Sequence, residues 1–60
     1  MELIELLECM DRTEKVELRS RDRKSYFIGS VKELLDIDEW SYRIVTFVTR
    51  GNLCLEIYVN

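Results

Sequence analysis

Residues 42–59 read Tyr-Arg-Ile-Val-Thr-Phe-Val-Thr-Arg-Gly-Asn-Leu-Cys-Leu-Glu-Ile-Tyr-Val and predict two strands joined by a turn. The first part, 42–49, is rich in the β-branched and aromatic residues typical of strands. The last part, 53–59, alternates in type, and one face carries Leu53, Leu55, Ile57 and Val59. Between them, Arg50-Gly51-Asn52 forms a turn in which Gly51 or Asn52 can adopt a positive φ.

A helix is predicted immediately before this strand pair. Ser30 and Glu33 stand three residues apart in the pattern of a capping box, which starts a helix at Val31. The helix directs Val31, Leu34 and Leu35 inward, and it either continues or breaks through 37–40.

The first half of the chain repeats this order. Residues 2–10 place their leucines and Ile4 on one side and predict a helix. Strands are predicted at 14–20, where Val16 and Leu18 point inward, and at 25–29, where Tyr26 and Ile28 join the same face. The sequence therefore predicts a single α+β domain over 1–60. Its order is α-β-β-α-β-β, with a four-stranded, largely antiparallel sheet and two short helices on one face.

Composition argues against catalysis. The 60 residues include no histidine, so no Ser-His or Cys-His pair can form, and we expect no enzyme and no catalytic residue. Cys9 and Cys54 supply too few ligands for a structural zinc site, so we expect reduced thiols, no metal and no cofactor. A net charge of −3 and the lack of a long apolar run favour a cytoplasmic protein with no membrane partner.

The sheet has apolar residues of both parities, so its second face is not fully polar. A domain of this size buries only about 60% of its unfolded surface, which favours stabilisation by a second copy. We therefore predict a homodimer through the second face, with an interface made by Phe27, Val45, Phe47, Cys54 and Tyr58. The alternatives are a second face that stays slightly apolar in solvent, or a helix over 31–40 that folds across it.

Charged residues suggest two further surfaces. Acidic residues on both predicted helices, together with a tryptophan, form a candidate partner-binding set of Glu5, Glu8, Asp38, Glu39 and Trp40. Ordinary solvated helix faces are the favoured explanation of the acids, and Trp40 fits either an interface anchor or a lid on the core. The basic hairpin 19–24 could hold a phosphate backbone, but the net negative charge makes direct nucleic-acid binding an unfavoured alternative.

The run Gly29-Ser30-Val31-Lys32-Glu33-Leu34-Leu35 supports a resemblance to known sequences. The chain resembles small uncharacterised αββαββ proteins of phages and mobile elements in Gram-positive bacteria. These begin with a short Leu-rich helix and carry a Gly-x-Val-Lys-Glu/Asp-Leu-Leu step between two strand pairs. The resemblance implies a phage accessory protein, a class that includes inhibitors of host antiviral defence such as anti-CRISPR proteins.

These observations together predict a non-enzymatic protein-binding module. We interpret it as a phage-encoded homodimeric inhibitor of a host antiviral defence or nucleic-acid-handling protein, such as a nuclease or helicase. The alternatives are a nucleic-acid-binding module that uses the hairpin 19–24 and a structural or assembly subunit.

Overall fold

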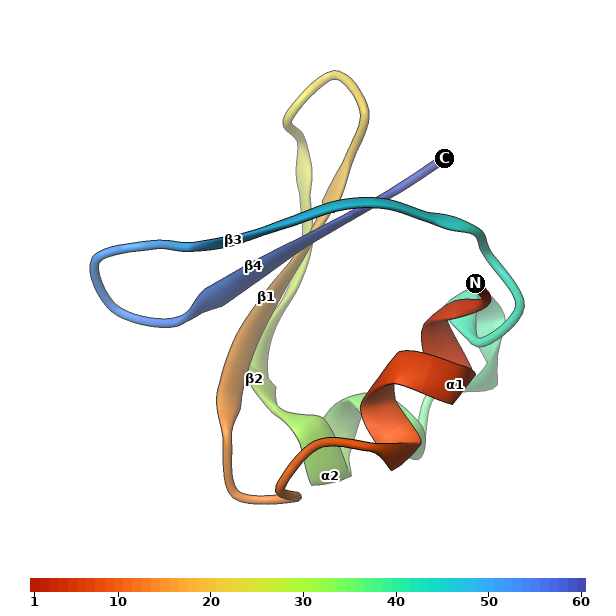
Figure 1. The fold of residues 1–60 in the computed structure, drawn as a ribbon, viewed down its shortest axis with the longest axis vertical. Helices are drawn as coiled ribbons and strands as arrows, with labels where there is room; N and C mark the ends of the chain where they lie inside the picture. Colours follow the sequence, from red (N-terminus) through yellow and green to blue (C-terminus); the bar gives the residue numbers. More distant parts are fainter.

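The computed structural model describes residues 1–60, and the predicted order of elements is confirmed (Figure 1). A 3-10 turn, η1, separates the second helix from the third strand, so the helix breaks before residues 37–40. The elements are α1 (Leu3–Glu8), β1 (Lys15–Ser20), β2 (Ser25–Ser30), α2 (Val31–Leu35), η1 (Asp38–Trp40), β3 (Val45–Arg50) and β4 (Leu55–Val59).

The four strands form one mixed sheet in the order β2-β1-β4-β3. Both hairpins, β1–β2 and β3–β4, are antiparallel, and the central pair β1–β4 is parallel. The predicted α+β class is therefore correct. The two αββ segments occupy different places in this sheet, because β1 is central whereas β3 lies at an edge.

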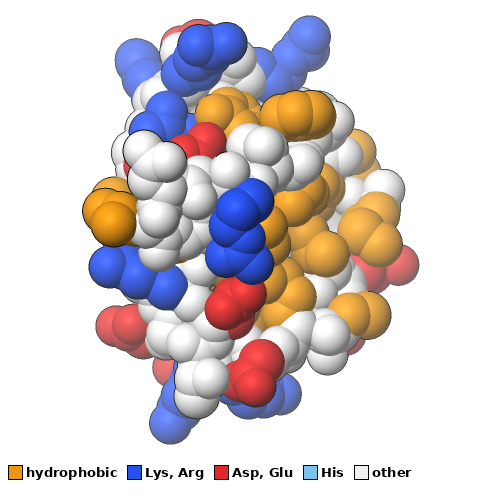
Figure 2. Space-filling model, turned by 60° about the vertical axis from the view of Figure 1, so that its left-hand side comes forward, with side chains coloured by type: hydrophobic (Ala, Val, Ile, Leu, Met, Phe, Trp, Pro, Cys, Tyr) orange, Lys and Arg blue, Asp and Glu red, His pale blue; other side chains and the backbone are white.

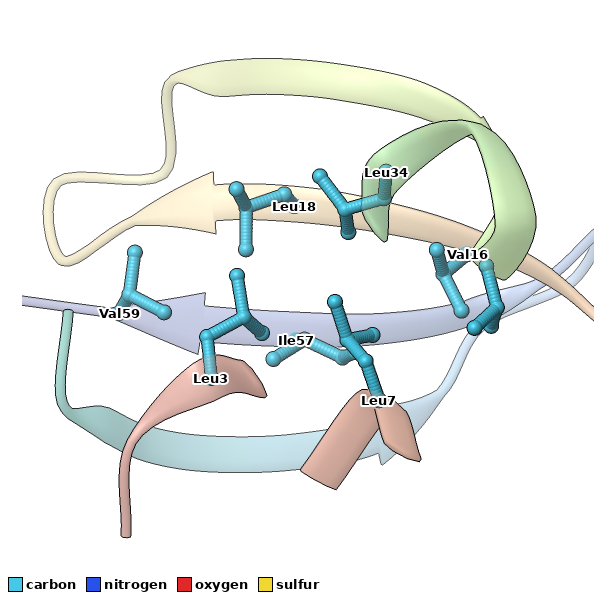
Figure 3. Close-up of a cluster of buried hydrophobic side chains, with 8 residues drawn as sticks. Leu3, Leu7, Val16, Leu18, Leu34, Ile57 and Val59 are labelled. Carbon is cyan, nitrogen blue, oxygen red and sulfur yellow. The ribbon is translucent and has the colours of Figure 1, made fainter. Parts of the chain in front are cut away.

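The core lies between the sheet and the two helices (Figure 3). Leu3 and Leu7 project from α1 toward the strand that carries Ile57 and Val59 (Figure 3). Strand alternation and helical spacing bring together eight fully buried side chains: Leu3, Leu7, Val16, Leu18, Val31, Leu34, Ile57 and Val59. Both helices therefore cover the same face of the sheet, as the sequence predicts.

A bulge in β2 alters the predicted faces of that strand. Leu18 pairs with Phe27 but Arg19 pairs with Ser25, so Tyr26 is an extra residue. Tyr26 and Phe27 consequently both pack against the core. Ile28, predicted to point inward, pairs with Glu17 on the opposite face and is 59% exposed.

A second bulge, at Thr46, settles the undecided parity of β3. Val45 pairs with Val59 and Val48 pairs with Ile57, so both valines lie on the helix-covered face. Phe47 pairs with Tyr58 on the outer face. The prediction that Leu53 belongs to the core is wrong, because the turn closes between Gly51 N and Cys54 O at 2.9 Å and leaves Leu53 86% exposed.

The predicted capping box starts α2. Ser30 Oγ accepts a hydrogen bond from Glu33 N at 3.1 Å, and Glu33 Oε1 accepts one from Ser30 N at 3.0 Å. The bond from the Ser30 backbone and a second one, donated by Ser30 Oγ to Glu33 Oε1 at 3.0 Å, lower the pKa of Glu33 from its ordinary value of 4.5. Because the folded pKa is the lower one, the carboxylate stabilises the fold above pH 4.5 and loses this contribution as the pH falls through the folded pKa.

Replacing Glu33 by glutamine should therefore lower stability more at neutral pH than in acid. Glutamine keeps an acceptor for Ser30 N, so the comparison isolates the charge. We expect a modest fall in melting temperature at pH 7 that diminishes at about pH 3, which lies below the ordinary pKa of 4.5. Thermal unfolding followed by circular dichroism at both pH values measures it. A difference that stays constant between the two would contradict the role of the charge.

Candidate functional site

Strand β3 is the part of the sheet that the helices leave uncovered. The two helices that cover one face of the sheet are short, with six and five residues. Val48 lies on the helix-covered face and is nevertheless 40% exposed, and Phe47 on the outer face is 59% exposed. Both faces of β3 therefore present apolar surface to solvent.

The backbone of β3 is open along most of its outer edge. At its beginning, the segment 1–3 lies alongside: Leu3 N donates to Arg43 O and Val45 N donates to Met1 O, both at 2.9 Å. From Thr46 to Arg50 the strand has β4 on one side and no backbone partner on the other. We call 46–50 the open edge. Every second residue there directs its N–H and C=O outward, which makes a template for another strand.

Apolar side chains gather on this side of the molecule. In Figure 2 the β3–β4 turn comes toward the reader, and an apolar band runs beside it with charged side chains along its borders. On the outer face the rings of Phe47 and Tyr58 lie 5.8 Å apart at 58°. Aromatic side chains are enriched at protein interfaces, so the exposed ring of Phe47 is a candidate anchor.

The centre of the outer face is polar and internally paired. Glu17 and Glu56 lie side by side on the parallel strands. Arg19 Nε lies 3.3 Å from Glu17 Oε2, in an ion pair without the alignment of a hydrogen bond, and this carboxylate raises the pKa of Arg19. Tyr58 Oη donates to Glu56 Oε1 at 3.1 Å. Glu17 is thus paired with Arg19, and Glu56 with the Tyr58 hydroxyl. Exposed apolar side chains of the outer face flank this polar group, with Phe47 on the β3 side and Ile28 on the β2 side.

A shallow hollow of about 190 Å³ opens next to this polar group. Cys54 is buried and belongs to its lining, whereas Cys9 is exposed elsewhere, and both thiols are free. No group of three or more Cys, Asp or Glu side chains is placed to hold a metal ion. The hollow is lined by Lys15, Glu17, Ile28, Asn52, Leu53, Cys54 and Glu56.

The residues expected at a dimer interface divide between the two faces. Phe47, Tyr58 and Cys54 lie on the outer side, as the parity argument requires of some of them. Phe27 and Val45 lie on the helix-covered face, so their predicted placement on the second face is wrong. The two bulges cause this error, because each extra residue reverses the alternation beyond it.

The acidic set lies on the helical side of the molecule. Glu5 and Glu8 are exposed on α1, and Asp38 and Glu39 are exposed on η1. Ile4 N donates to Ser41 O at 2.9 Å, which fastens the end of η1 to the start of α1. Binding of a partner by these acids stays a prediction.

Trp40 is placed as a lid. Its ring stacks on Tyr26 with centroids 5.6 Å apart and planes at 14°, and it packs against the core. Arg43 lies over the same tyrosine ring, with Cζ 5.6 Å from its centroid. Of the two roles left open by the sequence, the geometry favours the lid.

The basic hairpin carries less unpaired positive charge than its sequence suggests. Arg19 faces Glu17, so three cations, Arg21, Arg23 and Lys24, are left exposed at the tip. A hydrogen bond from the Ser20 hydroxyl lowers the pKa of Asp22, whose negative charge stays within this tip. Direct nucleic-acid binding through 19–24 stays an alternative without a specific structural observation in its favour.

Comparison of the chain with protein-family models, with curated proteins and with solved structures finds no match. None of its helices has the length and apolar character needed to cross a bilayer. The function must therefore be inferred from the chain's own residues.

Sequence reasoning did not single out Val48 or the open edge. Val48 was one of several apolar residues in 42–49, and nothing local distinguishes an edge strand from a central one. The sequence did contain one sign of an uncovered strand. The second predicted helix has few turns before Asp38, too few to cover a whole sheet.

Proposed function

We propose that this protein acts by binding other polypeptide chains, with no chemistry of its own, and that β3 makes the contact. The observation that carries the proposal is the open edge. Its backbone is unpaired on one side, and its side chains Phe47 and Val48 are exposed on the two opposite faces of the strand. Adding an extended segment to such an edge is a recurring mode of recognition, in which backbone bonds supply affinity and alternate side chains supply specificity.

Other features support the same proposal. Soluble proteins usually protect an edge strand with lysines, proline or a covering loop. From Thr46 to Thr49 the open edge has none of these, although the bulge at Thr46 and the charge of Arg50 mark its two ends. On the outer face Glu17 pairs with Arg19, and Glu56 accepts a hydrogen bond from Tyr58. Phe47, which packs beside Tyr58, stays largely exposed and available for contact.

The narrower proposal, a phage-encoded inhibitor of a host defence or nucleic-acid-handling protein in the host cytoplasm, depends on the resemblance of the Gly29–Leu35 step. A structural or assembly subunit that binds through the same strand is the alternative.

Selection of displayed peptides tests the binding proposal. A library of random peptides should yield, on the immobilised protein, sequences with alternating apolar residues that bind as extended strands. Replacing Phe47 by serine should weaken their binding at least about tenfold, because a large exposed aromatic anchor is removed. Surface plasmon resonance measures the affinities.

Ile28→Ser is the matched control. Ile28 is also 59% exposed on the outer face but lies in β2, at the opposite edge of the sheet. It should leave peptide affinity unchanged. Equal losses in the two variants, or selection of no strand-like peptide, would refute the proposed contact.

A further inference from the structure

We infer that the natural occupant of the open edge is β3 of a second copy of this chain, which joins the two sheets into one continuous eight-stranded sheet. This inference deepens the proposed function and depends on it. The expected dimer differs from the one predicted from sequence, because it joins edges and does not stack outer faces.

Geometry leaves one register that uses the whole open edge. In an antiparallel pair related by a two-fold axis, directly opposite residues have side chains on the same face. The axis must therefore place one residue of β3 directly opposite the same residue of the second copy. An axis at Phe47 would push the second copy against 44–45, where the segment 1–3 already pairs. An axis at Thr49 would pair only residues 48–50. An axis at Val48 pairs 46–50 with 50–46 and fits the unoccupied stretch.

This register is chemically self-complementary. Val48 faces Val48 of the second copy on the helix-covered side, and each valine covers the exposed part of the other. On the outer face Phe47 lies opposite Thr49 of the second copy and diagonal to its Phe47, within reach of an aromatic contact.

The charges are compatible with the same register. Arg50 is the sole charged residue of the open edge, and it lies opposite Thr46, so the two arginines stand at opposite ends about 13 Å apart. Each arginine also has its own partner, because Nη2 lies 3.4 Å from Glu14 Oε1.

The expected strength follows from area. A stable specific dimer buries about 800 Å² on each partner, roughly one fifth of this protein's surface of 4063 Å². Five edge residues with their flanking side chains supply less than this. We therefore expect an equilibrium between monomer and dimer that depends on concentration.

The register predicts which cysteine variant will cross-link. Opposite residues of an antiparallel pair have Cα atoms about 4.5–5.5 Å apart, the range that a disulfide requires. Val48→Cys, in a Cys9→Ser background with Cys54 left buried, should form a covalent dimer rapidly with diamide. Ile28→Cys is the control. Ile28 is more exposed than Val48, so cross-linking by random collision would be faster in the control. Non-reducing electrophoresis and peptide mass mapping measure the outcome.

Covalent dimer that forms at least about tenfold faster in the Val48→Cys variant than in the Ile28→Cys variant supports the inference, because proximity in a defined pair raises the effective concentration of the thiol. Mass mapping should place the disulfide at position 48 of both copies. Equal rates in the two variants overturn the inference.

Sedimentation of the unmodified chain gives the second measurement. The average mass should rise toward the dimer between about 10 and 300 μM, and Val48→Lys should return it to the monomer with an unchanged circular dichroism spectrum. A chain that stays monomeric over this range overturns the inference. The proposed function is judged separately, because peptides that bind a monomeric protein through Phe47 would uphold it.

Discussion

Replacing Ile57 by alanine is expected to unfold a large part of the protein. Ile57 is fully buried in β4, between β1 and β3 and beneath α1 (Figure 3). Removing the methyl and ethyl groups on its Cβ costs about 2–5 kcal/mol, because transfer energy is lost and the surrounding core collapses only in part. A domain of this size has a core worth roughly 3–5 kcal/mol, so the loss is comparable with its whole stability.

Urea denaturation followed by far-ultraviolet circular dichroism measures this effect, at one protein concentration for all variants. Leu53→Ala is the control, because Leu53 belongs to the same alternating sequence pattern but is almost fully exposed. We expect that variant to lie within about 0.5 kcal/mol of the unmodified protein. If Leu53→Ala destabilises the protein as strongly as Ile57→Ala, then Leu53 is buried as part of β4, and the turn between Gly51 and Cys54 is contradicted.

Replacing Trp40 by alanine is expected to destabilise the fold by about 2 kcal/mol. The ring is half-buried, so the loss is smaller than the roughly 3–5 kcal/mol of a fully buried aromatic residue, and it includes the stacking energy with Tyr26. Trp40→Phe keeps a ring over Tyr26 and should cost less than half as much.

The free energy of unfolding separates the two roles of Trp40. Unfolding is followed by circular dichroism, because these variants lack the single tryptophan that fluorescence would need. A lid on the core lowers stability when it is removed. An interface anchor lowers partner affinity and leaves stability unchanged, so an unchanged stability in Trp40→Ala would contradict the lid.

Local patterns in the sequence predicted much of the fold. Ser30 and Glu33 form the capping box because both bonds depend on residues three apart. Val16 and Leu18 point inward because regular alternation holds in the part of β1 that contains them. Features of this kind are encoded within one turn of helix or one pair of strand residues, which a single sequence displays directly.

The candidate site could not be predicted in the same way. An extra residue at Tyr26 or Thr46 leaves no mark in the alternation, yet it transfers the residues beyond it to the other face. The parallel pairing of Val16 with Leu55 joins distant segments and moves β3 to an edge. Exposure of Phe47 and Val48 follows from that strand order, and strand order depends on the whole chain.

The central position of β4 has a consequence for synthesis of the protein on the ribosome. Residues 55–59 emerge after all the other elements, yet β4 separates β1 from β3 in the sheet. Until they emerge, the β1–β2 hairpin and both helices lack the strand that completes their core, so a nascent chain exposes Val16, Leu18 and Leu7. Long-range parallel pairing is also slow to form, because the intervening chain must first be ordered. Folding is therefore expected after release of residues 55–59 from the exit tunnel, in a single late step that makes the unfinished chain a target for chaperones.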